Sequence, residues 1–347
     1  MGGIQVAGRP LTGARPTLED VAAVAGVSRA TASRVLNSSP RVSPEAHEAV
    51  TAAAQQLGYQ PNQAARTLVT RRTGAIAMVV SEPQAKVFND PHFGTLVRAA
   101  ASELALIDTQ LVLMLGLGEG SHGRAERFLR GGHVDGALLF APHQDDPLPT
   151  TVRKLHLPCV FGGRPWGSLR GLYTVDSDNE GGGYLATEHL LHMGRKTVVS
   201  VTGPDDELSS RDRLAGWIRA TNAGDAELTH LTESGDYTRE GGYHAMNLLL
   251  HRVPKLDGVF AANDLMAVGC LQALREANRR VPDDVAVVGF DDNSMIAPHA
   301  DPPLTTVRQD LGDQVRKMIA NLTVLIDGGS VRKREILPVQ LVRRESA

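Results

Sequence analysis

Short apolar runs alternate with longer runs of helical spacing along the chain from residue 74 onward. The strand-like runs are GAIAMVV (74–80), QLVLMLG (110–116), DGALLF (135–140), CVFGG (159–163), TVVSVTG (197–203), GVFAAND (258–264) and VAVVGF (285–290). Helical spacing lies between them, for example over 93–106, 180–193 and 265–277. Such alternation is typical of parallel sheets covered by helices on both faces. Because the pattern repeats in a second series after residue 194, we predict two doubly wound α/β subdomains and not one large sheet.

Polar residues collect at the carboxyl ends of these strand-like runs. They are Asn89, Asp90, Arg164, Arg211, Arg213, Asn263, Asp264, Asp291 and Asp292. Ligands of open α/β sheets bind beyond the carboxyl ends of the strands. Carboxylates, amides and guanidinium groups can each engage two hydroxyl groups at once. The pattern therefore predicts a cleft for a polyhydroxylated ligand, such as a sugar or a related small metabolite.

Residues 17–37, TLEDVAAVAGVSRATASRVLN, have the spacing of two short helices joined at Gly26. Thr17 is placed as the N-cap of the first helix and Ser28 as the N-cap of the second. A third amphipathic stretch follows over residues 43–58. Three short helices with a tight, glycine-containing first turn predict a small all-α helix-turn-helix unit.

The second of these helices has two different faces. Its apolar face carries Ala32, Val35 and Leu36, and the opposite face carries Arg29, Ala30, Ser33 and Arg34. An ordinary helical bundle with a solvated face is the alternative interpretation, but such a face usually mixes charges and this one is purely basic. The spacing therefore favours a DNA-reading helix. Arg34 suits a bidentate contact with guanine, Arg29 and Ala30 suit the variable bases, and Thr31 and Ser33 suit phosphates.

The charge is distributed unevenly along the chain. Residues 1–72 hold eight Arg and no Lys against four acids, which is +4 and leaves −7 for the rest of a chain whose total is −3. A basic head on an acidic body is expected if only the head contacts a polyanion.

The remaining segments are less informative. Residues 1–16 resemble a flexible tail without a signal peptide, and residues 62–73 could form a short helix that orders only when docked. No uncharged apolar run reaches the roughly 18 residues of a membrane span, so we expect a cytoplasmic protein that does not enter a membrane. Cys159 and Cys270 lie far apart in apolar surroundings, which indicates buried free thiols in a reducing compartment.

Several other motifs are weaker. GEGSHG (118–123) satisfies GxGxxG, but no acid ends a second strand about 20 residues later, so a surface loop is favoured over a dinucleotide site. His189 and His192 lie three residues apart without a third metal ligand at a suitable spacing. Neither GxSxG nor HExxH occurs. We therefore expect no enzyme activity, no cofactor and no metal site.

TLEDVAAVAGVSRATASRVLN, then VS at 42–43 and LGYQPNQAARTL at 57–68, together resemble the head and hinge of LacI/GalR-family transcriptional regulators. Later stretches extend the resemblance: VDSDNEGGGYLATEHL (175–190), SSRDRLAGW (209–217), GVFAANDLMAVG (258–269), VAVVGFDD (285–292) and PLTTVRQD (303–310). It covers almost everything after residue 16. It implies a repressor with a helix-turn-helix head at 17–61, a hinge helix at 62–73 and a body similar to periplasmic sugar-binding proteins.

In such a body the chain crosses between the subdomains three times. We place the crossings near Gly194, at 305–308 and at 327–330. The first subdomain is then expected to comprise 74–194 plus 308–327, and the second 195–305 plus 330–342.

The expected DNA contacts come from the helix-turn-helix pattern together with the family resemblance. They are Thr17, Ser28, Arg29, Ala30, Thr31, Ser33, Arg34, Asn37, Tyr59, Asn62, Ala65 and Leu68. By resemblance, the hinge helices of two subunits pair in the minor groove, where Leu68 wedges a base step apart and Ala65 permits close approach. We expect a homodimer on a palindromic operator, formed through the body and in particular through the helix at 93–106.

The expected ligand contacts combine the strand ends with the family motifs. They are Asn89, Phe93, Arg164, Asp178, Asn179, Arg213, Trp217, Asn263 and Asp291. Trp217 follows Arg213 by one helical turn, so it could equally belong to the core. His92 stands where the family often has an aromatic residue, and Gly181 to Gly183 form an unusual triple near the expected pocket. The resemblance thus implies a sugar-like effector without naming one.

Effector binding is expected to change the angle between the subdomains and so the order of the hinge helices. Release from DNA is the favoured direction, as in most sugar-responsive relatives. Two alternatives come from other classes of protein. The body alone would suit a binding or transport component, and a sugar-modifying enzyme with a regulatory head would need catalytic groups that the sequence does not offer.

Overall fold

The computed structural model describes residues 16–36, 42–60, 72–115 and 121–347. The chain divides into two compact units, a head ending at Thr73 and a body that begins at Gly74. The expected tail, most of the hinge and Asn37 lie outside the described residues, as does the first half of the glycine-rich run at 118–123.

The head contains the three predicted helices, α1 (Leu18–Val24), α2 (Arg29–Leu36) and α3 (Pro44–Leu57). Thr17 caps α1 in a capping box with Asp20. Gly26 ends the first turn with a φ of +66°, in the left-handed region that glycine adopts without strain. A small core holds the helices together, comprising Val21, Ala22, Ala32, Val35, Val50 and Ala53. The helix-turn-helix prediction is confirmed.

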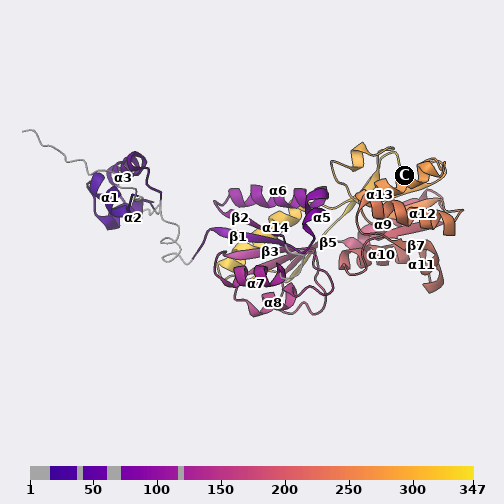
Figure 1. Cartoon of the computed structure of the whole chain (residues 1–347), viewed down its shortest axis with the longest axis horizontal. Helices are drawn as coiled ribbons and strands as arrows, with labels where there is room; N and C mark the ends of the chain where they lie inside the picture. Colours follow the sequence, from indigo (N-terminus) through magenta and orange to yellow (C-terminus); the bar gives the residue numbers. More distant parts are fainter. Residues whose placement is uncertain (1–15, 37–41, 61–71, 116–120) are drawn as a thin grey trace, which may run out of the picture. The chain divides into compact units, whose positions relative to one another are not determined.

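The first lobe of the body is built on a six-stranded parallel sheet in the order β11-β5-β4-β3-β1-β2. Its strands are β1 (Ala75–Val80), β2 (Gln110–Leu115), β3 (Gly136–Phe140), β4 (Cys159–Gly162), β5 (Thr174–Ser177) and β11 (Arg334–Leu337). The helices are α5 (Gln84–Asn89), α6 (Pro91–Ala105), α7 (Ser121–Arg130), α8 (Leu148–Lys154) and α14 (Leu311–Ile326). As Figure 1 shows, α6 and α14 lie on one side of the sheet and α7 and α8 on the other.

Alternation along β1 explains why this sheet is covered on both faces. Ile76 and Met78 belong to the core that includes Leu96 of α6 and Met318 of α14. Their neighbour Ala77 faces the opposite core, beneath α7 and α8. Successive side chains of a strand point to opposite faces, so both sides of the buried strand must be apolar.

The second lobe repeats the arrangement with the strand order β12-β10-β9-β8-β6-β7. Its strands are β6 (Val198–Thr202), β7 (Thr232–Ser234), β8 (Gly258–Ala261), β9 (Ala286–Asp291), β10 (Thr305–Arg308) and β12 (Gln340–Val342). Its helices are α9 (Asn179–His192), α10 (Leu208–Thr221), α11 (Asp225–Leu231), α12 (Arg239–Arg252) and α13 (Asp264–Glu276), with a short 3-10 turn at Ala297–His299. The β10–β12 pair is antiparallel, and the other pairs in this sheet are parallel.

The chain passes between the two sheets three times, but two of the predicted crossing points were wrong. β5 is in the first sheet, whereas α9 packs against α10 and β9 of the second lobe, so the first crossing lies near residue 178 and not at Gly194. β11 pairs with β5, which returns residues 334–337 to the first lobe. The predicted second-lobe segment 330–342 therefore splits, and only β12 belongs there. These short strands carry little apolar signal, because β11 contains two charged residues among four.

The two cysteines of the body are buried, as the sequence predicts. Cys159 and Cys270 are free and buried, and burial raises the pKa of each thiol to about 12. None of the helices in the described ranges is long and apolar enough to cross a membrane.

The glycine triple in α9 allows the backbones of α9 and α10 to touch. A Cβ added at Gly183 would lie 2.1 Å from the carbonyl oxygen of Arg213, and one added at Gly216 would lie 2.2 Å from that of Glu180. These contacts are with backbone atoms, which cannot rotate away. The backbones of α12 and α13 approach each other equally closely at Gly242 and Gly269. Close approach of the two helices sets where α10 delivers its polar side chains.

We predict that Gly183→Ala will destabilise the body, because the new methyl group must push α9 away from α10. The expected loss is about 1–3 kcal/mol in the free energy of unfolding, as for other overpacked cores. Gly123→Ala is the matched control, since its Cβ would lie 3.5 Å from a flexible Arg127 side chain, an ordinary contact. The control should be neutral or more stable by about 0.5–1 kcal/mol. Urea unfolding of both variants tests this prediction. An unchanged unfolding midpoint for Gly183→Ala would contradict it.

Candidate functional site

The second helix of the head presents the two faces that its sequence predicts. Ala32 and Val35 are buried in the head core, whereas Arg29, Ala30 and Arg34 are exposed. Arg29 pairs with the exposed Glu19 at 2.6 Å, a contact that solvent weakens. The guanidinium groups therefore lie on the solvent-facing side of a helix whose other side is fixed by packing.

The remaining predicted head residues have structural roles as well. Ser28 caps α2 by accepting a hydrogen bond from the Thr31 amide, and its hydroxyl lies 2.9 Å from that of Thr31. Ser33 is half-buried on the same helix. Tyr59 packs partly against the head core. Four further predicted contacts lie outside the described residues: Asn37, Asn62, Ala65 and Leu68.

A cavity lies between the two lobes of the body. Polar lining residues come from both sheets: Glu82, Lys86, Asp90, His92, Arg164, Asp176, Asn179, Glu207, Ser209, Arg213, Tyr237, Asn263, Asp291, Gln309 and Gln314. Phe93, Leu96 and Phe140 add apolar surface. The predicted location beyond the carboxyl ends of the strands agrees with this cavity.

Arg213 is the most heavily engaged side chain of the cavity. Its Nε donates to the Asn179 side-chain oxygen at 2.9 Å, and its Nη1 donates to the carbonyl of Ala262 at 2.5 Å. The guanidinium lies 3.7 Å from the ring centroid of Phe290 and 3.7 Å from an Asp291 carboxylate oxygen. Stacking and hydrogen bonding together hold a buried charge in one position.

Asn263 and Asp291 extend this array from neighbouring strand ends. Asn263 caps α13 through the Met266 amide and donates its side-chain nitrogen to the carbonyl of Tyr237. Asp291 has a φ of +112° and accepts a 2.6 Å hydrogen bond from Gln309. Burial raises the pKa of the Asp291 carboxyl, with the Arg213 charge opposing the shift. Both residues are thus fixed before a ligand arrives.

Asp176, at the end of β5, is linked to the Arg213 array through Asn179. Its Oδ1 accepts hydrogen bonds from the Ser177 amide and the Asn179 side chain. Burial raises the pKa of Asp176 to about 6. Nearby, Arg164 of the first lobe contacts both carboxylate oxygens of Asp212 in α10, each at 2.6 Å. This ion pair joins the two lobes.

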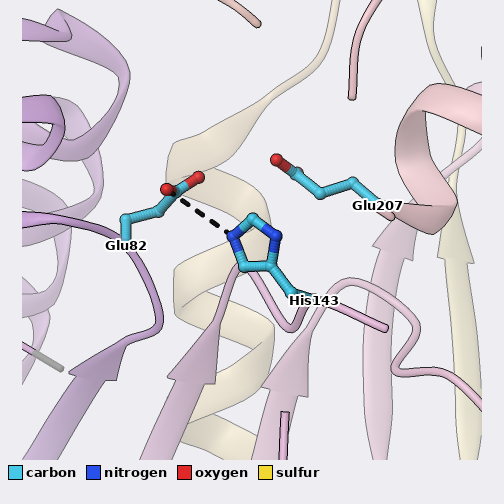
Figure 2. A group of neighbouring side chains, drawn as sticks. All are labelled: Glu82, His143 and Glu207. Carbon is cyan, nitrogen blue, oxygen red and sulfur yellow. Dashed lines mark ion pairs between the residues drawn. The ribbon is translucent and has the colours of Figure 1, made fainter. Parts of the chain in front are cut away.

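A second group of ionisable residues joins the lobes at another edge of the cavity, as Figure 2 shows. His143, from the loop after β3, lies between Glu82, which follows β1, and Glu207 at the start of α10. Its Nδ1 is 2.8 Å from Asp206, and the Glu82 carboxylate raises the pKa of His143 to about 9. Lys86 lies 2.5 Å from Glu82 and 3.7 Å from Glu207. Burial raises the pKa of Glu207.

Three of the predicted ligand contacts do not line the principal cavity. Trp217 is fully buried in the core of the second lobe, so the alternative interpretation as a core residue is correct. Asp178 is exposed and caps α9 through the Gly181 amide. Asn89 is exposed at the end of α5 and lines a neighbouring pocket. Trp217, one helical turn after Arg213, points into the core because α10 packs that face against β6 and α9.

Several cavity residues were missed by the sequence reasoning. Glu82, Lys86, Glu207, Tyr237 and Gln314 lie in loops or on helices, away from the strand ends that the pattern singled out. Glu82 lies only two residues after the end of β1, so a search for polar residues slightly further past the strand would have included it. Tyr237 has no such signal, because it reaches the cavity from a loop with a positive φ of 66°.

Two family models match the chain. The model described as "Bacterial regulatory proteins, lacI family" matches residues 17–62, and the one described as "Periplasmic binding protein-like domain" matches residues 187–347. The HTH-type transcriptional regulator CelR of Thermobifida fusca is 45% identical over 335 residues, covering 96% of this chain and 98% of that protein. The ribose operon repressor of Escherichia coli (strain K12) is 34% identical over 299 residues, covering 84% and 88%.

Solved structures agree with this assignment. The complex of CelR with cellobiose has a TM-score of 0.75 at 42% identity and covers 96% of this chain and 100% of that one. The lac repressor dimer bound to operator and the anti-inducer ONPF has a TM-score of 0.83 at 28% identity, covering 96% and 99%. With a helix-turn-helix head, a two-lobed body and similarity along nearly its whole length, the chain belongs to the LacI family of bacterial regulatory proteins.

Proposed function

We propose that this protein is a transcriptional repressor that binds a palindromic operator as a homodimer and is released by a small carbohydrate bound between its lobes. The observation that carries the proposal is the fixed array of Arg213, Asn179 and Asp291 in the cavity, in the same chain as an exposed basic helix-turn-helix face. A pre-arranged set of donors and acceptors suits a ligand whose hydroxyl groups have defined positions.

The chemistry of the cavity favours a neutral sugar. Five carboxyl groups line it against the three cations Lys86, Arg164 and Arg213. Burial raises the pKa of three of these carboxyl groups, those of Asp176, Glu207 and Asp291, which keeps the net charge of the lining small. Phe93 and Tyr237 add ring surface against which the C–H face of a sugar can pack. The solved CelR structure, which is 42% identical, is a complex with cellobiose. We therefore infer a disaccharide of this kind and name cellobiose as the first ligand to test.

In the proposed complex the head reads the operator. Arg34 makes a bidentate contact with guanine, Arg29 and Ala30 meet the variable bases, and Thr17, Ser28, Thr31 and Ser33 contact phosphates or secondary bases. Tyr59 supports this face from the head core. Asn37, Asn62, Ala65 and Leu68 keep the roles proposed from the sequence.

The dimer is proposed to form through the body, near α6. Large apolar side chains are exposed around this helix: Phe88, Leu106, Ile107 and Leu113. A second copy of the chain would bury them, as expected for a symmetric interface. No catalytic role is proposed for the cavity acids, and hydrolysis of cellobiose by the pure protein would contradict this function.

We predict that Arg34→Ala will weaken binding to the cognate operator by about 1–3 kcal/mol, roughly ten- to a hundredfold, because it removes a bidentate base contact. Arg130→Ala removes the same charge from an exposed helix of the body and is the control. Fluorescence anisotropy with a selected operator and a scrambled duplex measures both. Equal effects of the two variants, or an equal loss on both duplexes, would exclude a base-reading role for Arg34.

We predict that Arg213→Ala will retain operator binding and lose the response to cellobiose, because the array that holds the ligand loses its centre. Arg219→Ala, on the exposed side of the same helix, is the control and should respond normally. Removal of a buried charge can also unfold the lobe, so Asp291→Asn is tested in parallel. Isothermal calorimetry with cellobiose and a gel-shift assay give the result. Wild-type affinity in Arg213→Ala and Asp291→Asn would remove this array from the ligand site.

We predict that cellobiose affinity will rise about tenfold from pH 5 to pH 7. A ligand hydroxyl that donates to Oδ2 of Asp176 requires the ionised carboxyl, whose pKa in the empty cavity is raised to about 6. The bound ligand lowers that pKa, so binding releases a proton at lower pH and strengthens as pH rises. Asp176→Asn should flatten the profile. Calorimetry in buffers of different ionisation enthalpy counts the proton, and a pH-independent wild-type affinity would contradict this contact.

A further inference from the structure

The group Glu82, His143 and Glu207 leaves two buried polar atoms without a hydrogen bond in the described part of the chain. His143 Nε2 is 3.6 Å from Glu82 Oε2, which is too long for a hydrogen bond. Neither His143 Nε2 nor Glu207 Oε1 has a hydrogen-bond partner in the described part of the chain, although both atoms are buried. Figure 2 shows both carboxylates directed toward the imidazole from opposite sides.

The same distances suit coordination of a metal ion. One nitrogen and two carboxylate oxygens from these residues all lie within 4.8 Å of one another. Two ligands of a tetrahedral Zn²⁺ ion at about 2.0–2.1 Å are roughly 3.3 Å apart, close to the separation of His143 and Glu82. To coordinate an ion held by His143 and Glu82, the Glu207 carboxylate would have to shift by a small rotation of its side chain. Glu82 and Glu207 are almost fully buried, so water does not already satisfy them.

The surroundings of His143 also resemble a metal site. Its second nitrogen, Nδ1, lies 2.8 Å from Asp206, the arrangement in which a carboxylate orients a histidine toward a metal. The neighbouring carboxylates hold a proton on the imidazole at neutral pH, and a binding metal ion displaces it. Glu82, Glu207 and Asp206 together with the ammonium of Lys86 then carry a local charge of −2. This is the charge that a divalent cation neutralises.

We propose that Glu82, His143 and Glu207 bind a divalent transition metal ion, with Zn²⁺ preferred for this ligand set, and that the ion bridges the two lobes of the body. Glu82 and His143 belong to the first lobe, whereas Glu207 begins α10 of the second. The ion stabilises the closed arrangement of the lobes, because separating them removes Glu207 from its coordination. Lys86 is the resident competitor, since its ammonium lies beside both carboxylates.

The test uses the full-length protein, freed of metal with a chelator and titrated with Co²⁺, whose visible absorption reports coordination geometry. Wild type should bind one Co²⁺ with the intense bands of a four-coordinate ion, and Zn²⁺ should displace it. His143→Ala and Glu207→Gln should each weaken binding at least about tenfold. Lys86→Met should strengthen it, because the competing cation is gone. His251→Ala, an exposed histidine on α12, is the matched control and should change nothing.

A second readout addresses the bridge between the lobes. Small-angle scattering should show a smaller radius of gyration for wild type with Zn²⁺ than without it, and no change for Glu207→Gln. Wild-type Co²⁺ spectra in His143→Ala, or no binding below millimolar Co²⁺, would overturn the site. A spectrum that only His251→Ala abolishes would do the same. Neither operator nor cellobiose enters these measurements, so their failure leaves the proposed regulator function standing.

Discussion

The buried guanidinium of Arg213 is the interaction on which the cleft depends. It projects from α10 and meets Asn179 of α9, the Ala262 carbonyl after β8 and the ring of Phe290 in β9. A charge taken out of water is tolerated only when it is paired and hydrogen-bonded. These partners therefore determine its position, and the position is available only because Gly183 lets the backbones of α9 and α10 touch.

The two lobes meet through a consistent division of charge. Arg164, His143 and Lys86 of the first lobe face Asp212, Asp206 and Glu207 at the start of α10. Partly buried ion pairs add little net stability, because desolvation offsets most of their attraction. The ion pairs do specify how the lobes dock, however, because each cation of the first lobe meets an acid on one short segment of the second lobe. The lobes therefore close by docking the start of α10 against the first lobe. A ligand that contacts α10 acts on the same interface.

The fold was largely predictable from the sequence, because the local patterns and the tertiary packing agree. Capping residues and Gly26 place the head helices, and continuous burial along β1 reflects its position inside a two-sided sheet. Prediction was wrong where short polar strands depend on partners distant in sequence, as for β11, which pairs with β5 more than a hundred residues away. The residues of the cavity divide in the same way into predictable and unpredictable ones. Arg213 and Asp291 follow strands, whereas Tyr237 reaches it from a loop whose path only the tertiary structure determines.

The path from cavity to head runs along β1, and its mechanics limit how a signal can travel. The strand is hydrogen-bonded on both sides, to β2 and β3, and its first residues are held where the Gly74 amide donates to Asp135 at 2.9 Å. A strand so constrained cannot stretch or twist independently, so events near Glu82 reach residue 74 as a rotation of the whole first lobe. Along the chain, the body begins at Gly74, directly before β1 of the first lobe. In the proposed dimer the signal is therefore the relative orientation of two first lobes, and the surface around α6 converts closure of the cleft into a change in spacing between the two linkers.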